Sequence, residues 1–282
     1  LNPDVLVMTA TPIPRTLSLT YYGDLDVSII DELPKNRIPI KTYLRKEENK
    51  FEIWDFVKEK INEGRQAFII YPIIDDSEKL DLKSAEENYK ILKNEVFKEY
   101  NVGMVHGRKF WYEIEETMND FKAQKIKVLV ATTVIEVGLD IPNATIMIIE
   151  DAQRYGLSQL HQLRGRVGRG AEQSYCILIA KHLDEVSKRR LKTMCETTDG
   201  FKISEVDMEI RGPGEFFGTR QSGVLNFVLT DLNKDRDILD SARKIAFGII
   251  ESDPQLRMED HKVIKKMLLT TYKDAMYLMN IA

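Results

Sequence analysis

The fold is decided by the stretch VLVATTVIEVGLDIP at residues 128–142 and by the apolar run IMII at residues 146–149. Each contains about four consecutive apolar residues, too few for a buried helix and without the alternation of a half-exposed strand. Such runs are typical of strands that are buried on both faces of a parallel sheet. The stretch therefore predicts two neighbouring strands joined by a connection that carries threonines, a glycine and an aspartate.

Similar apolar runs lie on both sides of this stretch and alternate with helical patterns. Strands are expected at residues 40–44, 67–71, 102–105, 128–131, 146–149 and 175–179, and helices at 51–61, 84–100, 111–121 and 158–164. Phe51, Trp54, Val57 and Ile61 recur at helical spacing, and Gly64 is expected to end that helix. This alternation predicts an α/β domain at about 38–182, a doubly wound parallel sheet with helices on both faces.

Three further segments flank the expected domain. Residues 1–37 contain a short apolar run at 4–8, a helix start near Pro14 and a polar linker with two prolines from about residue 31. Residues 183–233 begin with a basic helix and continue into a glycine-rich segment at 211–223. Val186, Leu191 and Met194 form the apolar stripe of that helix. Residues 234–282 predict two C-terminal helices, at about 235–251 and 257–280.

The composition is that of a folded globular chain, with 43% hydrophobic and 30% charged residues. No apolar run approaches the roughly 18 residues of a membrane span, so no membrane association is expected. Cys176 and Cys195 are too few for a disulfide framework, and the four histidines lack the spacing of metal ligands. We therefore expect no metal site, a reducing cytoplasmic location and a core position for Cys176. The chain begins with Leu1 and carries no signal peptide, and we expect it to be a fragment of a longer protein.

The charge distribution points to one local anion site. The formal net charge is −4, which does not indicate a nucleic-acid-binding protein by itself. Residues 152–171, however, contain no acidic residue and four arginines: Arg154, Arg164, Arg166 and Arg169. This cluster predicts a discrete site for an anion, most simply phosphate.

The segment QLRGRVGR at residues 162–169 carries the strongest chemical signal. Arg166 and Arg169 are three residues apart and each follows a glycine, so the backbone can approach a ligand closely. Two planar guanidinium groups match phosphate oxygens and could stabilise charge on a γ-phosphate, the role of an arginine finger. A solvated basic turn is the alternative interpretation.

The ends of two expected strands carry further polar residues. Thr132 and Thr133 could bind phosphate at a helix N-terminus, or one of them could simply cap that helix. Asp140 follows Gly138 in a turn from which a carboxylate could reach a ribose hydroxyl. The segment HGRK at 106–109 follows another strand and could lie over a phosphate, or could be an ordinary loop.

Other features are weaker. Acidic pairs end the apolar runs at residues 31–32 and 150–151, in the manner of metal-holding strands. The chain contains no G-x-x-x-x-G-K-[ST] loop, so we expect these pairs to be plain strand ends and the fragment alone not to hydrolyse ATP. Phe216 and Phe217 could stack on bases, although core packing is the commoner role of such a pair.

Several of these segments resemble motifs of superfamily 2 helicases and stand in the order of that family. MTATPIPRT at 8–16 resembles motif III, residues 132–142 resemble motif V, and 162–169 resemble motif VI. DMEIRGPGEFFGTRQSG at 207–223 resembles the translocation motif shared by the RecG and Mfd families. YGDLDV at 22–27 and GEFFGT at 214–219 favour the RecG family.

The resemblance implies a RecA-like motor lobe 2 that closes on ATP held by lobe 1, followed by a helical hairpin and C-terminal helices. It assigns roles by position. The catalytic residues would be Arg166 and Arg169. ATP would be bound by Gly138, Asp140, Gln162, Arg166 and Arg169. Thr9 and Thr11 would couple the two lobes. The DNA-binding residues would be His106, Arg108, Thr132 and Thr133, and the translocation residues Arg190, Arg211 and Gln221.

The resemblance also implies partners and an activity. The parent protein would be an ATP-dependent double-stranded-DNA translocase that remodels stalled replication forks and Holliday junctions at the nucleoid. ATP and Mg²⁺ would be bound mainly by lobe 1, of which residues 1–37 would be the tail. The full-length protein would be monomeric, whereas the exposed inter-lobe face would allow this fragment to dimerise. The alternatives are an Mfd-like translocase, an RNA helicase of the same superfamily and a non-catalytic DNA-binding module.

Overall fold

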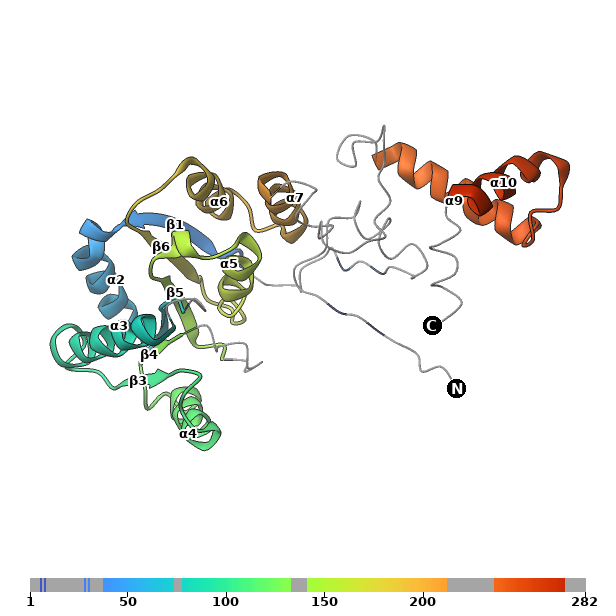
Figure 1. Ribbon diagram of the computed structural model, residues 1–282. Coiled ribbons are helices and arrows are strands. Elements are labelled where there is room, and N and C mark those ends of the chain that lie inside the picture. Colours follow the sequence, from blue (N-terminus) through green and yellow to red (C-terminus); the bar gives the residue numbers. More distant parts are fainter. Residues whose placement is uncertain are drawn as a thin grey trace. The chain divides into compact units, whose positions relative to one another are not determined.

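A computed structural model describes residues 38–73, 78–132, 141–211 and 236–271, together with positions 6, 8, 28 and 30. The chain divides into two compact units (Figure 1). Most described residues of the first unit lie between 38 and 210, and most of those of the second lie between 236 and 271.

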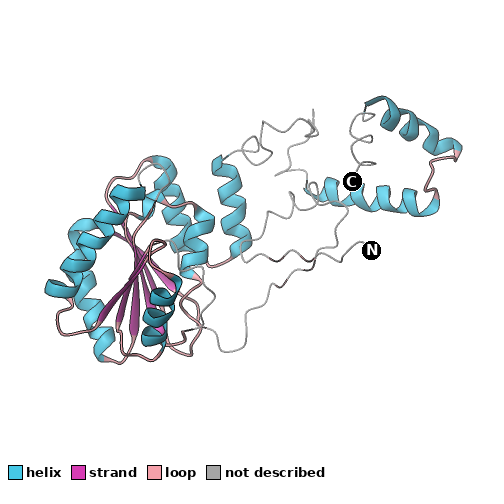
Figure 2. Ribbon diagram, turned by 60° about the horizontal axis from the view of Figure 1, so that its bottom comes forward, coloured by secondary structure: helices cyan, strands magenta, loops and turns pink. Residues whose placement is uncertain are grey.

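One parallel sheet forms the centre of the first unit (Figure 2). Its strands are β1 (Lys41–Lys46), β2 (Gln66–Ile70), β3 (Val102–Val105), β4 (Val128–Ala131), β5 (Ala144–Ile149) and β6 (Tyr175–Ala180). The spatial order is β1-β6-β5-β2-β4-β3, and every neighbouring pair is parallel. The predicted parallel sheet is confirmed, and the bounds of β3 and β4 coincide with those expected from their apolar runs.

Helices connect these strands. They are η1 (Glu47–Asn49), α2 (Lys50–Asn62), α3 (Glu78–Ile91), the π-helical turn η3 (Leu92–Val96), α4 (Trp111–Lys122), η4 (Ala152–Arg154), α5 (Leu157–Arg164), α6 (Glu185–Glu196) and α7 (Gly200–Arg211). The four helices expected between strands are therefore all present, although α3 begins six residues earlier than predicted. Gly64 has φ +89° and follows the end of α2, as its position predicted.

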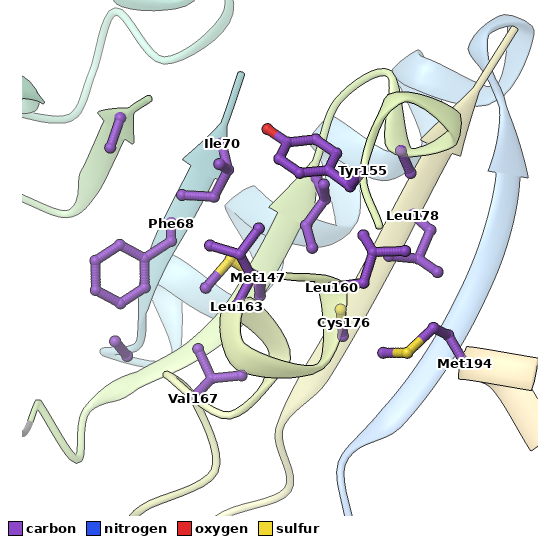
Figure 3. Close-up of a cluster of buried hydrophobic side chains, with 14 of the residues drawn as sticks. Phe68, Ile70, Met147, Tyr155, Leu160, Leu163, Val167, Cys176, Leu178 and Met194 are labelled. Carbon is purple, nitrogen blue, oxygen red and sulfur yellow. The ribbon is translucent and has the colours of Figure 1, made fainter. Parts of the chain in front are cut away.

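The sheet is covered on both faces, because alternate residues of each central strand point to opposite sides. On one face, Ala67 and Ile69 of β2 pack with the buried residues of α2 and α3. On the other face, Phe68 and Ile70 pack with residues of α4, α5, α6 and α7. Figure 3 shows part of this cluster, including Leu160 and Leu163 of α5 and Met194 of α6. This arrangement confirms the doubly wound α/β fold.

Two apolar residues depart from the expected helix stripes. Phe51 is 83% exposed, and the buried side of α2 is formed by Ile53, Trp54, Val57 and Ile61 instead. Val186 is 49% exposed in the first turn of α6, while Leu191 and Met194 are buried as predicted. Both exceptions lie in the first turn of a helix, and the sheet-facing stripe begins after them.

Helices α6 and α7 form a hairpin whose apolar side joins the core of the sheet. Leu191, Met194 and Ile203 belong to the same buried cluster as the central strands. An ion pair between Arg189 and Glu209 links the two helices. The predicted hairpin therefore shares its hydrophobic core with the preceding α/β layers.

The second unit contains α9 (Arg236–Ser252), the 3₁₀ turn η5 (Glu259–His261) and α10 (Lys262–Thr271). Asp253 organises the connection between the helices, because its carboxylate accepts hydrogen bonds from the backbone of Arg257 (2.9 Å) and Met258 (2.8 Å) and lies 3.0 Å from His261 Nδ1. These backbone donors lower the pKa of Asp253 to about 2. Helix α9 agrees with the expected range, and α10 falls within the second expected helix.

Some predicted features lie outside the described residues. The linker, the glycine-rich segment at 212–223 and most residues of the strand expected at 4–8 are among them. Leu6 and Met8 are described, and their side chains are 80% and 83% exposed. Within the part of the chain that the structure describes, no helix is long and apolar enough to cross a membrane.

Candidate functional site

A turn at residues 165–170 carries Arg166 and Arg169 from the end of α5 to the start of β6. Gly168 has φ +78°, and a Cβ atom there would lie 2.8 Å from Cγ1 of Ile40. At Gly170, a Cβ atom would lie 2.8 Å from the carbonyl oxygen of Pro142. Ile40 precedes β1 and Pro142 precedes β5, so the turn lies against the amino-terminal edge of the sheet.

The two tight glycines therefore fix the shape of the turn. The sequence predicts that Gly165 and Gly168, which precede the two arginines, let the backbone approach a ligand. In the structure, Gly168 and Gly170 allow the backbone to approach Ile40 and Pro142 of the protein itself. Gly165 differs, since it has φ −66° and its closest contacts would be ordinary ones at 3.4 Å.

The four arginines of residues 152–171 do not form one cluster, and this corrects the expectation of a shared anion site. Arg164 is 2% exposed and donates to the carbonyl oxygens of Met194 and Thr197, both at 2.8 Å. Arg154 forms a two-pronged pair with Asp81 at 3.0 and 2.9 Å. Both guanidinium groups are therefore engaged within the protein, Arg164 in the core and Arg154 in an exposed ion pair.

The remaining arginines, Arg166 and Arg169, lie on the turn itself. Arg166 is half-buried and Arg169 is exposed, while Val167 between them is fully buried in the core. Gln162, in the last turn of α5, is exposed as well. The buried valine anchors the turn and leaves the arginines at the surface of the amino-terminal edge.

His106 and Thr132 lie at the opposite, carboxyl-terminal edge. They directly follow β3 and β4, which pair with Val105 opposite Ala131, so the two residues are neighbours across the strands. His106 is 9% exposed; its Nδ1 accepts a hydrogen bond from the backbone of Arg108 (3.3 Å), and its Nε2 lies 3.8 Å from Glu86. Burial, assisted by the positive charge of Lys109, lowers the pKa of His106 and favours the neutral ring.

Thr132 presents a buried polar group at the same edge. Its side chain is fully buried, and its hydroxyl has no hydrogen-bond partner among the residues described. Lys109, which the sequence grouped with His106 and Arg108, donates to the carbonyl oxygen of Met104 at 2.8 Å. The lysine therefore supports the turn, while Arg108 is exposed beside it.

Arg190 connects the helical hairpin to the sheet. Its guanidinium donates to the carbonyl oxygens of Tyr155 (2.8 Å) and Gln153 (3.2 Å) and to the hydroxyl of Ser187 (3.0 Å). Gln153 and Tyr155 lie in the connection between β5 and α5, immediately before the helix that leads to the arginine turn. No sequence pattern indicated these partners, because two of the three are backbone carbonyls.

The acidic pair Glu150–Asp151 ends β5, as expected. Glu150 is 3% exposed and lies 3.1 Å from Lys50, and burial raises the pKa of Glu150 despite this partner. Lys50 also contacts Glu47 at 3.1 Å. Within the described ranges, no group of three or more histidine, cysteine or acidic side chains could hold a metal ion.

Several predicted site residues lie outside the described residues. They are Thr9, Thr11, Thr133, Gly138, Asp140 and Gln221; for Arg211, only the backbone position at the end of α7 is described. The structure therefore brings together two groups of predicted residues. Arg166 and Arg169 lie at the amino-terminal edge, and His106, Arg108 and Thr132 lie at the carboxyl-terminal edge.

The fold and the arginine turn define the class of protein. Residues 49–171 match the family described as the helicase conserved C-terminal domain. The first unit thus has the RecA-like fold of the helicase C-terminal domain, as the resemblance implied.

The comparisons also identify the family within that class. Residues 197–282 match the family described as ATP-dependent DNA helicase RecG, domain 3, C-terminal. The chain is 48% identical to ATP-dependent DNA helicase RecG of Bacillus subtilis over 95% of this chain and 39% of that protein. It is also 48% identical to the RecG of Thermotoga maritima over 86% of this chain and 31% of that protein.

A solved structure supports the same assignment. It is described as the structure of RecG bound to a three-way DNA junction, is 45% identical with a TM-score of 0.66, and is matched over 84% of this chain and 30% of that one. The chain belongs to the RecG family. It spans 39% of the B. subtilis relative and corresponds to a C-terminal part of the family.

Proposed function

We propose that this chain is the C-terminal motor lobe of an ATP-dependent double-stranded-DNA translocase. The full-length protein would remodel stalled replication forks and Holliday junctions by branch migration and fork reversal. The observation that carries this proposal is the rigid turn at 165–170, which displays Arg166 and Arg169 on a RecA-like lobe of the RecG family. Such a lobe supplies arginines to a nucleotide held by a second lobe.

At the amino-terminal edge, the two guanidinium forks fit the oxygens of a γ-phosphate. As the lobes close, Arg166 and Arg169 would neutralise the negative charge that develops on the transferred phosphoryl group. Gly138, Asp140 and Gln162 would complete the nucleotide contacts. The described residues offer no carboxylate cluster for Mg²⁺, so the ion and most of the ATP would be held by lobe 1.

At the carboxyl-terminal edge, His106, Arg108, Thr132 and Thr133 would contact the DNA backbone. The hydroxyl of Thr132, which has no hydrogen-bond partner among the residues described, supports this assignment, because a buried hydroxyl is stabilised by an acceptor such as a phosphate oxygen. Thr9 and Thr11 would couple the DNA site to the nucleotide site on lobe 1.

Translocation would depend on the hairpin of α6 and α7 and the glycine-rich segment that follows, with Arg190, Arg211 and Gln221 as the key residues. Arg190 supports this role through its bonds to the carbonyls of Gln153 and Tyr155. Because that segment leads directly into α5, movement of the arginine turn would be transmitted to the hairpin. Lobe closure would thereby become movement along the duplex.

The organisation follows from this assignment. Residues 1–37 would belong to lobe 1, 38–182 to lobe 2, 183–233 to the hairpin and translocation loop, and 234–282 to the C-terminal helices. The full-length protein would act as a monomer in the cytoplasm, associated with the nucleoid. This fragment would not hydrolyse ATP alone and could dimerise through the inter-lobe face.

The proposal is tested by ATP hydrolysis of the full-length protein with forked DNA, linear duplex and single-stranded RNA as separate activators. We expect much stronger stimulation by forked DNA. Stimulation by RNA, or equal stimulation by all DNA structures, would contradict fork remodelling while leaving the helicase fold intact. DNA binding without any stimulated hydrolysis would favour a non-catalytic binding module. Direct binding of the full-length protein to RNA polymerase would instead indicate an Mfd-like translocase.

A further inference from the structure

Three consecutive aromatic side chains lie on the surface at the start of α4. Phe110, Trp111 and Tyr112 are 66%, 74% and 53% exposed. The rings of Phe110 and Tyr112 are nearly parallel, at an interplanar angle of 6° with centroids 5.5 Å apart, and Trp111 meets Tyr112 edge to face at 6.3 Å. We refer to these three residues as the aromatic trio. They form an ordered group of rings that faces solvent.

The fold does not require the trio. Helix α4 packs on the core through the buried Met118 and Phe121 and the partly buried Ile114, and none of the trio belongs to that cluster. The start of the helix is held by a hydrogen bond from the backbone N–H of Phe110 to Glu113 (3.0 Å), which does not depend on the ring at position 110. Three adjacent exposed rings therefore add nothing to the core, and such patches commonly mark binding surfaces.

The position of the trio indicates what it binds. The trio directly follows the turn at 106–109, at the carboxyl-terminal edge proposed to contact the DNA backbone. Arg108 and Lys109 provide positive charge on one side of the trio. Glu115 and Glu116 are exposed one helical turn beyond Trp111 and Tyr112 and provide negative charge on the other side. A nucleic-acid strand would thus pass on the Arg108 side with its bases directed toward the rings.

We propose that the aromatic trio is a stacking platform for unpaired bases of a DNA strand at a branch point. This inference rests on the proposed function and extends it to a second kind of DNA contact. Base faces are available for stacking on a side chain only where they are not stacked within a duplex, so the trio would select unpaired nucleotides. Exposed rings beside a basic groove are the usual combination in proteins that bind single strands.

The proposal can be tested directly by the intrinsic fluorescence of the 282-residue chain. The chain has two tryptophans, of which Trp54 is 7% exposed and Trp111 is 74% exposed, so quenching by an added ligand reports mainly on Trp111. We expect a single-stranded oligothymidylate to quench the emission, and the Trp111→Ala variant to lose this response. Unchanged emission at a concentration where a labelled oligothymidylate is bound would overturn the proposal, and so would failure of the oligonucleotide to bind.

Affinity measurements on the full-length protein provide a second test. Phe110→Ala and Trp111→Ala should each weaken binding to a fork with unpaired nucleotides at its branch by about tenfold. Both should leave binding to a linear duplex and the unfolding temperature unchanged. Phe51→Ala is the matched control, because Phe51 is an 83% exposed aromatic in the first turn of α2, which follows β1 at the other end of the sheet. Equal affinities for all three variants, or equal losses on fork and duplex, would overturn the proposal.

These outcomes are independent of the proposed motor function. If forked DNA stimulates ATP hydrolysis but leaves the Trp111 emission unchanged, the motor assignment stands and the platform is wrong. If the emission is quenched while no DNA stimulates hydrolysis, the proposed motor function is wrong, whereas the contact between the trio and unpaired bases stands. If the aromatic trio binds another protein instead of DNA, oligothymidylate will leave the Trp111 emission unchanged. That result would contradict the stacking platform.

Discussion

The two edges of the sheet hold their functional residues in different ways. At the amino-terminal edge, the backbone of Gly168 and Gly170 packs against Ile40 and Pro142, and this close packing sets the direction of the arginine turn. At the carboxyl-terminal edge, buried polar side chains set the geometry, with His106 accepting a hydrogen bond and Thr132 buried beside it. One site depends on glycine backbone, and the other on side-chain contacts.

Two differently built sites on one short sheet should tolerate substitutions independently of each other. The strands are four to six residues long, which separates the edges by about 13–20 Å. The central strands between them are fully buried, and no functional residue is predicted within them. We therefore expect substitutions at one edge to leave the activity of the other edge largely unchanged.

The largest expected effect is that of Arg169→Ala on ATP hydrolysis. Loss of an arginine that stabilises the transferred phosphoryl group should reduce the DNA-stimulated rate of the full-length protein by about 10³-fold, while the dissociation constant for forked DNA should change little. Arg65→Ala is the matched control, because Arg65 lies at the same edge and pairs with Glu172 at 2.9 Å. A parallel loss of hydrolysis and DNA binding would indicate that Arg169 is structural.

A second prediction compares the stability contribution of the buried Arg164 with that of Arg166 on the turn. Arg164→Ala removes a buried guanidinium and leaves the carbonyls of Met194 and Thr197 without their donor, so the free energy of unfolding should fall by about 3 kcal/mol. Arg166→Ala should change it by less than about 1 kcal/mol, because Arg166 is only half-buried and lies outside the core. Urea unfolding of both variants measures the difference. Equal values would contradict the division of the four arginines into two roles.

The glycines of the turn give a third, smaller effect. Gly168→Ala introduces a Cβ at positive φ and 2.8 Å from Ile40, and it should cost about 1–2 kcal/mol of stability and displace the arginines. Gly165→Ala is the matched control, since its backbone is in the right-handed helical region with ordinary contacts at 3.4 Å. Thermal unfolding together with ATP hydrolysis measures both consequences. If both variants behave alike, backbone packing does not orient the turn.

The smallest expected effect is a pH dependence of stability. Burial lowers the pKa of His161, on the helix leading to the arginine turn, from 6.5 to about 4. The unfolded chain therefore binds a proton more readily than the folded one between these values, so stability should fall as the pH decreases from about 6.5 to 4. The histidine is partly exposed, and the loss at pH 5 should be on the order of 1 kcal/mol.

Comparison of the wild-type chain with His161→Gln isolates this histidine from the other titrating groups. The stability difference between the two should shift in favour of the variant between pH 7 and pH 5. A difference that does not vary with pH would show that the neutral, buried state of His161 is not the cause.

The sequence predicted the sheet well because its signals are local. The runs at 102–105 and 128–131 become β3 and β4 with the same bounds, because a strand of consecutive apolar residues is stable where both of its faces are covered. The helix stripes were predicted less accurately, because Phe51 and Val186 lie in the first turn of their helices, before the buried residues begin.

The site was predicted less completely, because its contacts join distant parts of the chain. Nothing local distinguishes Arg154, which pairs with Asp81, or Arg164, which donates to the backbone after α6, from Arg166 and Arg169. From the sequence, Trp111 and Tyr112 are expected only as the first residues of the helix at 111–121, and Phe110 carries no prediction. Three adjacent aromatic residues are visible in the sequence ahead of the buried residues of α4. Their exposure becomes evident only from the position of α4 on the sheet.

The independence of the two edges is tested most directly by ATP hydrolysis of the full-length protein at increasing concentrations of forked DNA. The comparison requires Gly168→Ala at one edge and Arg108→Ala at the other. We predict that Gly168→Ala lowers the maximal rate and leaves the half-activating DNA concentration unchanged. Arg108→Ala should raise the half-activating concentration several-fold, by about 1 kcal/mol for one lost phosphate contact, and leave the maximal rate unchanged. A change of both parameters by either variant would contradict the assignment of separate functions to the two edges.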